Sequence, residues 1–217
     1  MTDPVSRPPL LAVLDYGIGN LRSAQKALER VGADARLTAD PGLVRNADAV
    51  VLPGVGAFGA CMDALRGAGL ETVALEAVES QRPFLGICVG MQMLFSVSDE
   101  DPHAVGLGVI PGAVRWISAE VPRPQMQWNR LAVAAAHADD PMFTGLADET
   151  WMYFVHSLHG VPDDASTVAA TCDYGGTVNA AFRSGNVFAT QFHPEKSGRD
   201  GLALLANFVA GVGSVAR

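Results

Sequence analysis

Short apolar runs alternate with amphipathic segments along the first 96 residues of the chain. The apolar runs predict four buried strands, over residues 10–15, 35–38, 49–52 and 83–87. Helices are predicted after Asn20, over residues 61–80 and from Val89 to Phe95. Such alternation is typical of an α/β fold whose parallel sheet is covered on both faces, with ligands beyond the carboxyl ends of the strands. We therefore expect the loops at Gly17, Gly54 and Cys88 to share one edge of the sheet.

The pattern changes after Phe95, where most of the predicted elements are strands. Candidate strands cover residues 113–117, 150–156 and 168–172, and a hairpin is predicted around 184–186. The acidic segment from Ser98 to His103 is expected to be a surface loop, and residues 201–212 read as an amphipathic helix. We predict one domain over residues 1–217, with a core of about 10–212, a polar tail over 1–9 and extra antiparallel strands in the C-terminal half.

Composition and charge narrow the class of protein. Hydrophobic residues make up 49% of the chain, charged residues 18%, and the net charge is −8, which argues against nucleic acid or an anionic membrane as partner. No apolar run reaches membrane-spanning length. The three cysteines are widely spaced, which favours reduced thiols in a soluble cytoplasmic protein. We expect no metal site. A dinucleotide cofactor is not expected either, because the fingerprint begun by Gly17 and Gly19 would need its third glycine at Arg22, and a tight turn near an active or partner surface is the favoured interpretation.

The stretch Gly86-Ile87-Cys88-Val89-Gly90 is the strongest candidate for chemistry. It joins a predicted strand to a predicted helix, so Cys88 is expected on a sharp, strained turn that exposes its sulfur. At a helix N-terminus the dipole favours thiolate over thiol. A nucleophile is the interpretation that this geometry suits, and a small buried cysteine beside two turn glycines is the alternative.

A cysteine nucleophile needs a base and a group that orients the base. The strand over residues 187–192 leads directly into His193-Pro194-Glu195, where the carboxylate can fold back onto the imidazole. A loop with a chance salt link is the alternative. His103 and His137 lie in polar stretches and are expected to be solvated, whereas His156 or His159 could line a pocket.

A second glycine-rich loop, Pro53-Gly54-Val55-Gly56, follows the third predicted strand. Such a loop can present backbone N–H groups to an anion, as an oxyanion hole requires. An ordinary flexible connection is an equally good reading of this loop taken alone.

Together these motifs resemble the class I (triad-type) glutamine amidotransferases. Residues 86–92 are similar to the nucleophile motif of that family, residues 191–197 to its histidine-glutamate motif and residues 53–56 to its oxyanion strand. Residues 15–21 and 153–157 narrow the resemblance to the branch whose members are glutaminase subunits of imidazole glycerol phosphate synthases, in histidine biosynthesis. The resemblance implies a flavodoxin-like, mainly parallel sheet flanked by helices. It also implies hydrolysis of glutamine to glutamate and ammonia.

Site roles follow from this resemblance. It implies that Cys88 is the nucleophile, His193 the general acid and base, and Glu195 the residue that orients His193. The oxyanion hole is expected at the backbone N–H groups of Val55 or Gly56 and of Val89, and the substrate glutamine at Gln92 and Glu100.

The same resemblance implies a partner, a (β/α)₈ cyclase subunit that receives ammonia and makes imidazole glycerol phosphate and aminoimidazole carboxamide ribotide. The expected contacts are Asn20, Trp128 and Lys196. The chain departs from the branch near that interface, because Gln125, Gln127 and Leu158 stand where the branch usually has histidine, glycine and an aromatic residue. Gln127 cannot adopt the backbone range of glycine without cost.

Three other functions are compatible with some of these features. A glutaminase could serve another acceptor synthase, and a cysteine hydrolase or peptidase could use the same fold. A catalytically silent scaffold could bind a barrel partner. Gln92 and the loop at residues 53–56 favour a glutaminase, and the intact Cys88, His193 and Glu195 argue against a silent scaffold.

Overall fold

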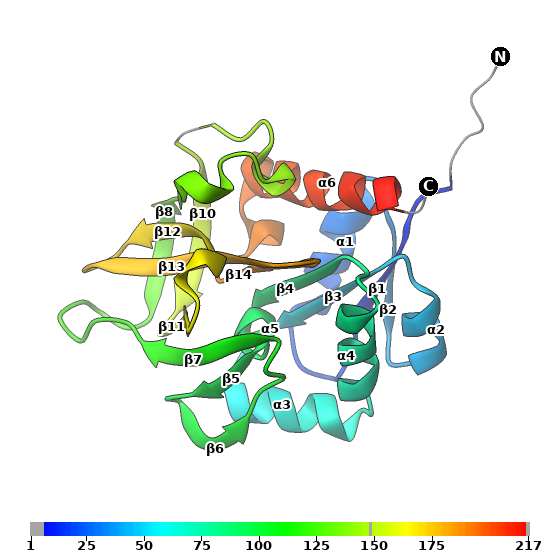
Figure 1. The fold of residues 1–217 in the computed structure, drawn as a ribbon, viewed down its shortest axis with the longest axis horizontal. Helices are drawn as coiled ribbons and strands as arrows, with labels where there is room; N and C mark the ends of the chain where they lie inside the picture. The colour runs from blue at the N-terminus through cyan, green and yellow to red at the C-terminus, as the bar shows by residue number, and fades with distance from the viewer. Residues whose placement is uncertain (1–6, 148, 216–217) are drawn as a thin grey trace.

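One central sheet organises the chain in the computed structural model, which describes residues 7–147 and 149–215 (Figure 1). Its strands are β1 (Leu10–Leu14), β2 (Asp34–Thr38), β3 (Ala49–Gly54), β4 (Phe84–Cys88), β9 (Ala132–Val133), β12 (Val168–Asp173), β13 (Thr177–Ser184) and β14 (Val187–Thr190). They lie in the order β2-β1-β3-β4-β14-β13-β12-β9. Strands β1 to β4 and β14 pair in parallel, and β13, β12 and β9 extend the sheet antiparallel. The predicted α/β class with extra antiparallel strands is confirmed.

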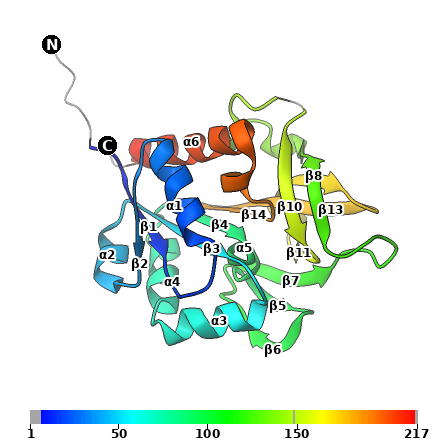
Figure 2. The ribbon, with the colours of Figure 1, turned by 180° about the vertical axis from the view of Figure 1, so that it is seen from behind.

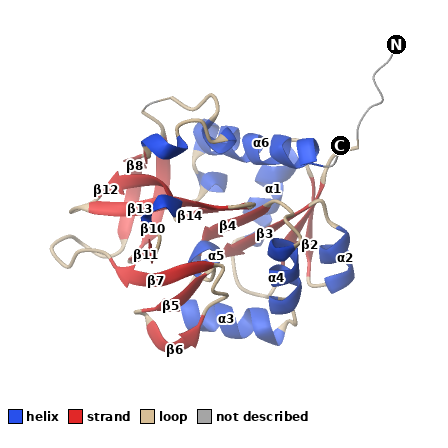
Figure 3. Ribbon diagram, viewed as in Figure 1, coloured by secondary structure: helices blue, strands red, loops and turns tan. Residues whose placement is uncertain are grey.

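Helices cover both faces of this sheet (Figure 3). They are α1 (Leu21–Arg30), α2 (Pro41–Asn46), α3 (Phe58–Gly67), α4 (Glu71–Glu79), α5 (Val89–Gln92) and α6 (Gly198–Val215). Helices α1 and α6 contact each other on one face, whereas α3 and α4 lie on the other. The predicted apolar stripe of α1 is buried at Leu21, Ala24 and Leu28, which shows why its sequence spacing forms a helix here. Short 3₁₀ turns occur at Ala135–His137, Pro141–Phe143, Ala165–Thr167 and Pro194–Lys196.

Two smaller sheets accompany the central sheet. One contains β5 (Phe95–Ser98), β6 (Asp101–Val105), β7 (Ile110–Trp116) and β11 (Leu158–Pro162), in the order β11-β7-β5-β6. The other pairs β8 (Gln125–Arg130) with β10 (Trp151–His156) in antiparallel register. Figure 2 shows β8 and β10 side by side at the end of the molecule opposite α2.

Two local predictions were wrong. The helix expected from Val89 to Phe95 ends at Gln92, and Phe95 already begins β5. Segment 98–103 was expected to be a loop, but it contains the end of β5 and the start of β6, with Ser98 only 3% exposed. In both cases pairing with neighbouring strands overrides the local pattern. Residues 1–6 of the predicted polar tail lie outside the described residues.

Close packing at the carboxyl ends of β3 and β4 positions the candidate site. Gly54 lies opposite Cys88 in the parallel register. A Cβ on Gly54 would stand 2.6 Å from the backbone nitrogen of Gly90, and a Cβ on Gly90 would collide with the carbonyl oxygen of Leu52. Glycine at both positions therefore lets residues 53–56, which we call the oxyanion loop, pass directly over the turn that carries Cys88.

Candidate active site

Cys88 occupies the strained turn that its flanking glycines predict. Its φ is +56° and its ψ −115°, and among the described residues only Gln81 is another non-glycine residue with positive φ. The side chain is 4% exposed. The helix that follows has only four residues, so its dipole contributes little to stabilising a thiolate. The sulfur therefore depends on side chains and loop amides around it.

His193 and Glu195 form a buried pair. The Nδ1 atom of His193 lies 2.7 Å from Oε1 of Glu195, and the side chains are 2% and 3% exposed. The His193 backbone N–H donates to the carbonyl of Tyr153 at 3.0 Å, which anchors the loop to β10. Because a carboxylate only accepts hydrogen bonds, Nδ1 carries the proton and Nε2 is left as the basic atom.

Electrostatics at His193 favour the imidazolium. Burial alone would favour the neutral ring, but the Cys88 sulfur and the Glu195 carboxylate outweigh it and raise the pKa of His193 to about 9. Its Nε2 atom is buried without a hydrogen-bond partner among the described residues. A proton on this ring at neutral pH is thus stabilised by the Cys88 sulfur and the Glu195 carboxylate beside it.

One cavity of about 280 Å³ brings the predicted site residues together. Its lining includes Val55, Gly56, Cys88, Val89, Gln92, Glu100, His193 and Lys196. The Glu100 carboxylate accepts a hydrogen bond from the backbone N–H of Phe58 at 2.7 Å, at the start of α3. This bond holds an acidic group at the cavity wall, where it can bind a cationic part of a small substrate.

The loop at residues 53–56 is held by two side chains to which the sequence analysis assigned no role in the site. The hydroxyl of Tyr16 donates to the carbonyl of Pro53 at 2.7 Å, and the thiol of Cys61 donates to the carbonyl of Val55 at 3.3 Å. Burial and the neighbouring Cys61 raise the pKa of Tyr16, so its hydroxyl stays protonated and remains a donor. Cys61 belongs to the hydrophobic core. It is buried, and it also fixes the loop.

The side-chain amides of Gln92 and Gln191 connect the cysteine to β11. Nε2 of Gln92 donates to Oε1 of Gln191 at 3.0 Å and to the carbonyl of Leu158 at 3.3 Å. Nε2 of Gln191 donates to Sγ of Cys88 at 3.8 Å. Gln191 lies inside the histidine-glutamate motif, but sequence reasoning assigned it no role.

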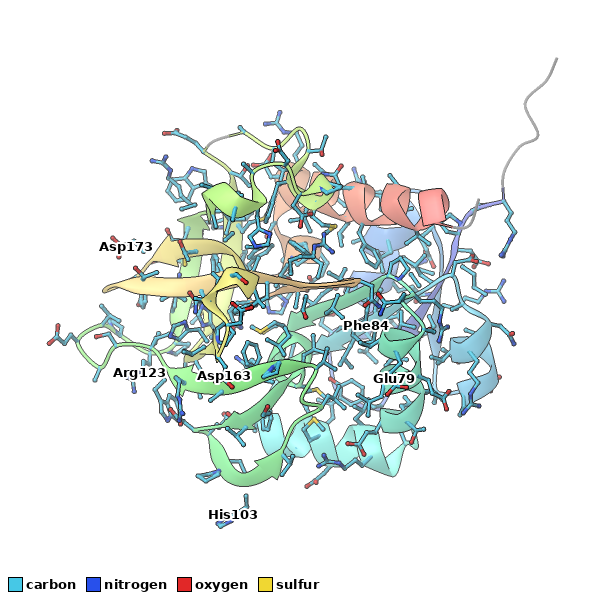
Figure 4. The ribbon with its side chains drawn as sticks, viewed as in Figure 1. Glu79, Phe84, His103, Arg123, Asp163 and Asp173 are labelled. Carbon is cyan, nitrogen blue, oxygen red and sulfur yellow. The ribbon has the colours of Figure 1, made fainter. Side chains whose placement is uncertain are left out.

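The other histidines differ in their surroundings. His156 lines the cavity, and its Nδ1 donates to the carbonyl of Leu158 at 2.7 Å. Burial lowers the pKa of His156 to about 4, with His159 and His193 adding to the shift, so the ring is neutral at pH 7. His103 is exposed and points away from the molecule (Figure 4), as expected. His137 is half-buried, with its Nε2 2.8 Å from the carbonyl of Ser166.

Two of the three predicted interface residues, Lys196 and Asn20, line pockets at the site. Lys196 lines the main cavity, and Asn20 lines a small crevice of about 10 Å³ with His193 and Glu195. Trp128 on β8 is 48% exposed, and its ring packs edge-on against Tyr153 at 6.1 Å between centroids.

The departures at residues 125 and 127 are accommodated by a regular strand. Gln127 is exposed on β8 opposite Phe154, and it is not among the described non-glycine residues with positive φ. Gln125 is fully buried, and its Nε2 donates to Sγ of Cys172 at 3.8 Å. Gln127 therefore needs no glycine-like backbone at this position.

Neither a metal centre nor a membrane-spanning helix occurs in the described part of the chain. No group of three or more His, Cys, Asp or Glu residues in 7–147 and 149–215 is arranged to hold a metal ion. Within the same ranges, no helix has the length and apolarity needed to cross a membrane.

The sequence matches a known protein family and is similar to known members of that family. Residues 12–212 match the family described as glutamine amidotransferase class-I. Imidazole glycerol phosphate synthase subunit HisH of Syntrophotalea carbinolica is 50% identical over 206 residues, covering 92% of this chain and 98% of that protein. HisH of Methanothermobacter thermautotrophicus is 48% identical over 200 residues, with coverage of 92% and 98%.

Solved structures agree on the fold. A putative GMP synthase protein from Thermoplasma acidophilum has a TM-score of 0.72 at 22% identity, covering 97% of each chain. PurLQS from Thermotoga maritima has a TM-score of 0.72 at 21% identity, covering 94% of this chain and 98% of that chain.

Proposed function

Because the chain belongs to the class I glutamine amidotransferase family, we propose that it is the glutaminase subunit of an imidazole glycerol phosphate synthase in histidine biosynthesis. The observation that carries the proposal is a single cavity lined by Cys88, His193 and the oxyanion loop, in a chain about half identical to HisH subunits. We also propose that residues 1–217 form one domain and that the enzyme works in the cytoplasm.

The first step is attack by Cys88 on glutamine. The thiolate sulfur forms a bond to the side-chain amide carbon, and negative charge moves to the amide oxygen. Backbone N–H groups of Val89 and of Val55 or Gly56 hold that oxyanion, since they line the cavity beside the sulfur. The oxyanion then collapses, the C–N bond breaks, and the His193 imidazolium gives its Nε2 proton to the departing ammonia.

The second step removes the glutamyl group. Neutral His193 now takes a proton from water through Nε2, and the resulting hydroxide attacks the thioester carbon. The C–S bond breaks, which releases glutamate and restores the thiolate and imidazolium. Glu195 keeps the proton on Nδ1 throughout and stabilises the positive ring, a role supported by the 2.7 Å contact.

Glu100 and Gln92 orient the substrate. The Glu100 carboxylate suits the α-ammonium group of glutamine, which an acidic cavity wall attracts. Gln92 uses its Nε2 within the protein, which leaves its Oε1 as the atom available to the substrate. A short polar amide substrate fits a cavity of about 280 Å³ better than a peptide chain does.

The partner is a (β/α)₈ cyclase subunit that receives the ammonia. Its docking surface is the outer face of β8 and β10, where Met126, Trp128 and Trp151 are 62%, 48% and 46% exposed. Exposed aromatic and methionine side chains of this kind are typical of the centre of a protein interface. Val155, on β10 opposite Met126, also lines the catalytic cavity. The docking surface and the active site are therefore continuous, as direct transfer of ammonia needs.

The test separates glutamine chemistry from ammonia chemistry in the complex with a cyclase subunit. Cys88→Ala should lower glutamine-dependent synthesis by about 10³-fold or more, while synthesis from added ammonium salt stays within about twofold of wild type. Cys172→Ala is the matched control, because Cys172 is equally buried but does not line the cavity, and it should keep both activities.

Three results decide the proposal. Full glutamine-dependent activity in Cys88→Ala would contradict the assigned nucleophile. Loss of both activities in a folded Cys88→Ala complex would mean that Cys88 acts in assembly rather than in hydrolysis. Glutaminase activity that no cyclase subunit can use would point to another acceptor synthase.

A further inference from the structure

The side chain of Gln191 has an unusual position for a residue without an assigned role. It directly follows β14, is fully buried, and ends at the reactive sulfur, with its Nε2 3.8 Å from Sγ of Cys88. Its other end is also bonded, because Oε1 accepts a hydrogen bond from Nε2 of Gln92 at 3.0 Å. The neutral amide of Gln191 is thus held between Cys88 at the turn and Gln92 at the end of α5.

The direction of these hydrogen bonds is set by a backbone carbonyl. The carbonyl of Leu158 can only accept, so the Gln92 atom that faces it at 3.3 Å is an NH₂ group. The same NH₂ group faces Gln191, so the Gln191 atom in that contact is the carbonyl oxygen. The remaining end of Gln191, which faces the sulfur, is therefore an N–H donor.

A second donor strengthens this arrangement. Nδ1 of His156 also lies 2.7 Å from the Leu158 carbonyl, so both donors converge on one acceptor from different elements. The two glutamines cannot flip their amides without placing oxygen against oxygen at Leu158 or against the sulfur. The N–H directed at Cys88 is thus built into the fold.

We propose that Gln191 is a further catalytic residue, which donates a hydrogen bond to the Cys88 sulfur and stabilises its negative charge. This inference rests on the proposed function, in which Cys88 is the nucleophile. A charged acceptor gains about twice as much from such a bond as a neutral one, so the bond favours the thiolate over the thiol. With α5 only four residues long, Gln191 supplies a donor that the helix dipole does not.

The reaction uses this donor in both steps. Before attack, it raises the fraction of Cys88 that carries negative charge and points the sulfur into the cavity. During hydrolysis of the thioester, the C–S bond breaks and its electron pair returns to the sulfur, where the Gln191 N–H again meets a thiolate. A purely structural glutamine would satisfy its own amide and leave the ionisation of the sulfur unchanged.

The test follows alkylation of Cys88 by iodoacetamide across pH, in the full-length chain, by mass spectrometry of the peptide that contains Cys88. Gln191→Met keeps the length but lacks a donor, and Gln191→Glu places a carboxylate against the sulfur. Thr190→Val is the control, because Thr190 is also buried and its hydroxyl donates to the Phe192 carbonyl rather than to the Cys88 sulfur.

We expect the pH of half-maximal alkylation to rise by about one unit in Gln191→Met, equivalent to about tenfold slower alkylation below that pH. The rise should be larger in Gln191→Glu and absent in Thr190→Val. A midpoint in folded Gln191→Met that equals the wild-type value would overturn the proposal.

A measurement on the wild-type chain covers the case in which these variants do not fold. The side-chain amide resonances of Gln191 should shift with pH at the same midpoint as alkylation, and this shift should be missing in Cys88→Ala. Resonances that do not respond to pH, or respond equally in Cys88→Ala, refute the inference. Alkylation needs no glutamine turnover. A Gln191-dependent midpoint in a chain that shows no glutaminase activity even with a cyclase subunit would therefore contradict the proposed function alone.

Discussion

Replacing Glu195 by glutamine tests the electrostatic account of the active site. The substitution keeps the shape of the side chain but removes the negative charge 2.7 Å from Nδ1 of His193. Both side chains are almost fully buried, so bulk water does not screen the loss. The new amide can also donate to Nδ1, which would move the ring proton to Nε2 and abolish the base.

The size of the effect follows from the Cys88 sulfur and the Glu195 carboxylate, which both raise the pKa of His193. Together with burial, the Cys88 sulfur and Glu195 take the pKa of His193 from 6.5 to about 9. That difference corresponds to about 3 kcal/mol. If the Cys88 sulfur and Glu195 contribute similarly to this rise in pKa, Glu195→Gln lowers the pKa of His193 by at least about one unit. With the tautomer also disturbed, glutamine hydrolysis should fall by about 10²- to 10⁴-fold.

The same variant makes a signed prediction for stability. A raised pKa means that the folded state binds the proton more tightly than the unfolded chain. The stabilisation from protonated His193 is therefore complete below about pH 6.5 and is lost as the pH rises through about 9. The difference in unfolding free energy between wild type and Glu195→Gln should be about 1–2 kcal/mol at pH 6 and shrink toward pH 10.

Two assays check these values. Glutamate release is measured in the complex with the cyclase subunit, and NMR of ¹⁵N-labelled histidine follows the ring of His193 across pH. Glu120→Gln serves as the control because Glu120 is an exposed glutamate outside the site. Hydrolysis within threefold of wild type, or an unchanged His193 titration in a folded variant, would refute the reasoning.

The fold and the proposed docking surface give three further predictions. Gly90→Ala forces a Cβ against the Leu52 carbonyl, so urea denaturation should show a loss of at least about 3 kcal/mol or no folded protein. Arg183→Met breaks two 2.7 Å bonds to Asp140 and should cost about 3 kcal/mol at pH 7. Burial alone would raise the pKa of Asp140, but the hydrogen bonds and charge of Arg183 outweigh burial and lower that pKa. The loss of stability in Arg183→Met should therefore shrink below about pH 4, where Asp140 becomes protonated. A loss that does not change with pH contradicts this prediction. Trp128→Ala should weaken binding to the cyclase subunit by about 2 kcal/mol in calorimetry without changing the thermal midpoint, and unchanged affinity would remove β8 from the interface.

Much of the fold was predictable because its signals are local. The strands that became β1, β3 and β4 are continuous apolar runs, as expected for strands buried on both faces. The turn at Cys88 was predictable from two glycines, and the pairing of His193 with Glu195 from their spacing of two residues. Each of these features is specified within a few neighbouring residues.

The strands of the smaller sheets were harder to predict. Residues 125–130 have no clean alternation, because most positions of β8 are exposed on both faces. Strand β6 is similar, since it lies at the edge of a sheet and none of its residues is fully buried. Local pattern carries little information where a strand buries little apolar surface.

The contacts that support the site could not be predicted from the sequence. Cys61 sits in an ordinary helical pattern, and its contact with Val55 depends on how the oxyanion loop folds over α3. Gln191 reaches Cys88 across 103 residues of sequence. Motifs identified the reacting groups, whereas the residues that hold them emerged only from tertiary packing.

The measurement that tests the central claim most directly is the rate of glutamate release by the purified chain, with and without the ligand-bound cyclase subunit. We expect the isolated chain to be nearly inactive, because its docking surface is exposed and Nε2 of His193 is buried without a hydrogen-bond partner among the described residues. The rate should rise by orders of magnitude in the complex and disappear in Cys88→Ala. Equal rates with and without the partner would contradict coupling to a cyclase subunit, and hydrolysis that survives in Cys88→Ala would contradict Cys88 as the nucleophile.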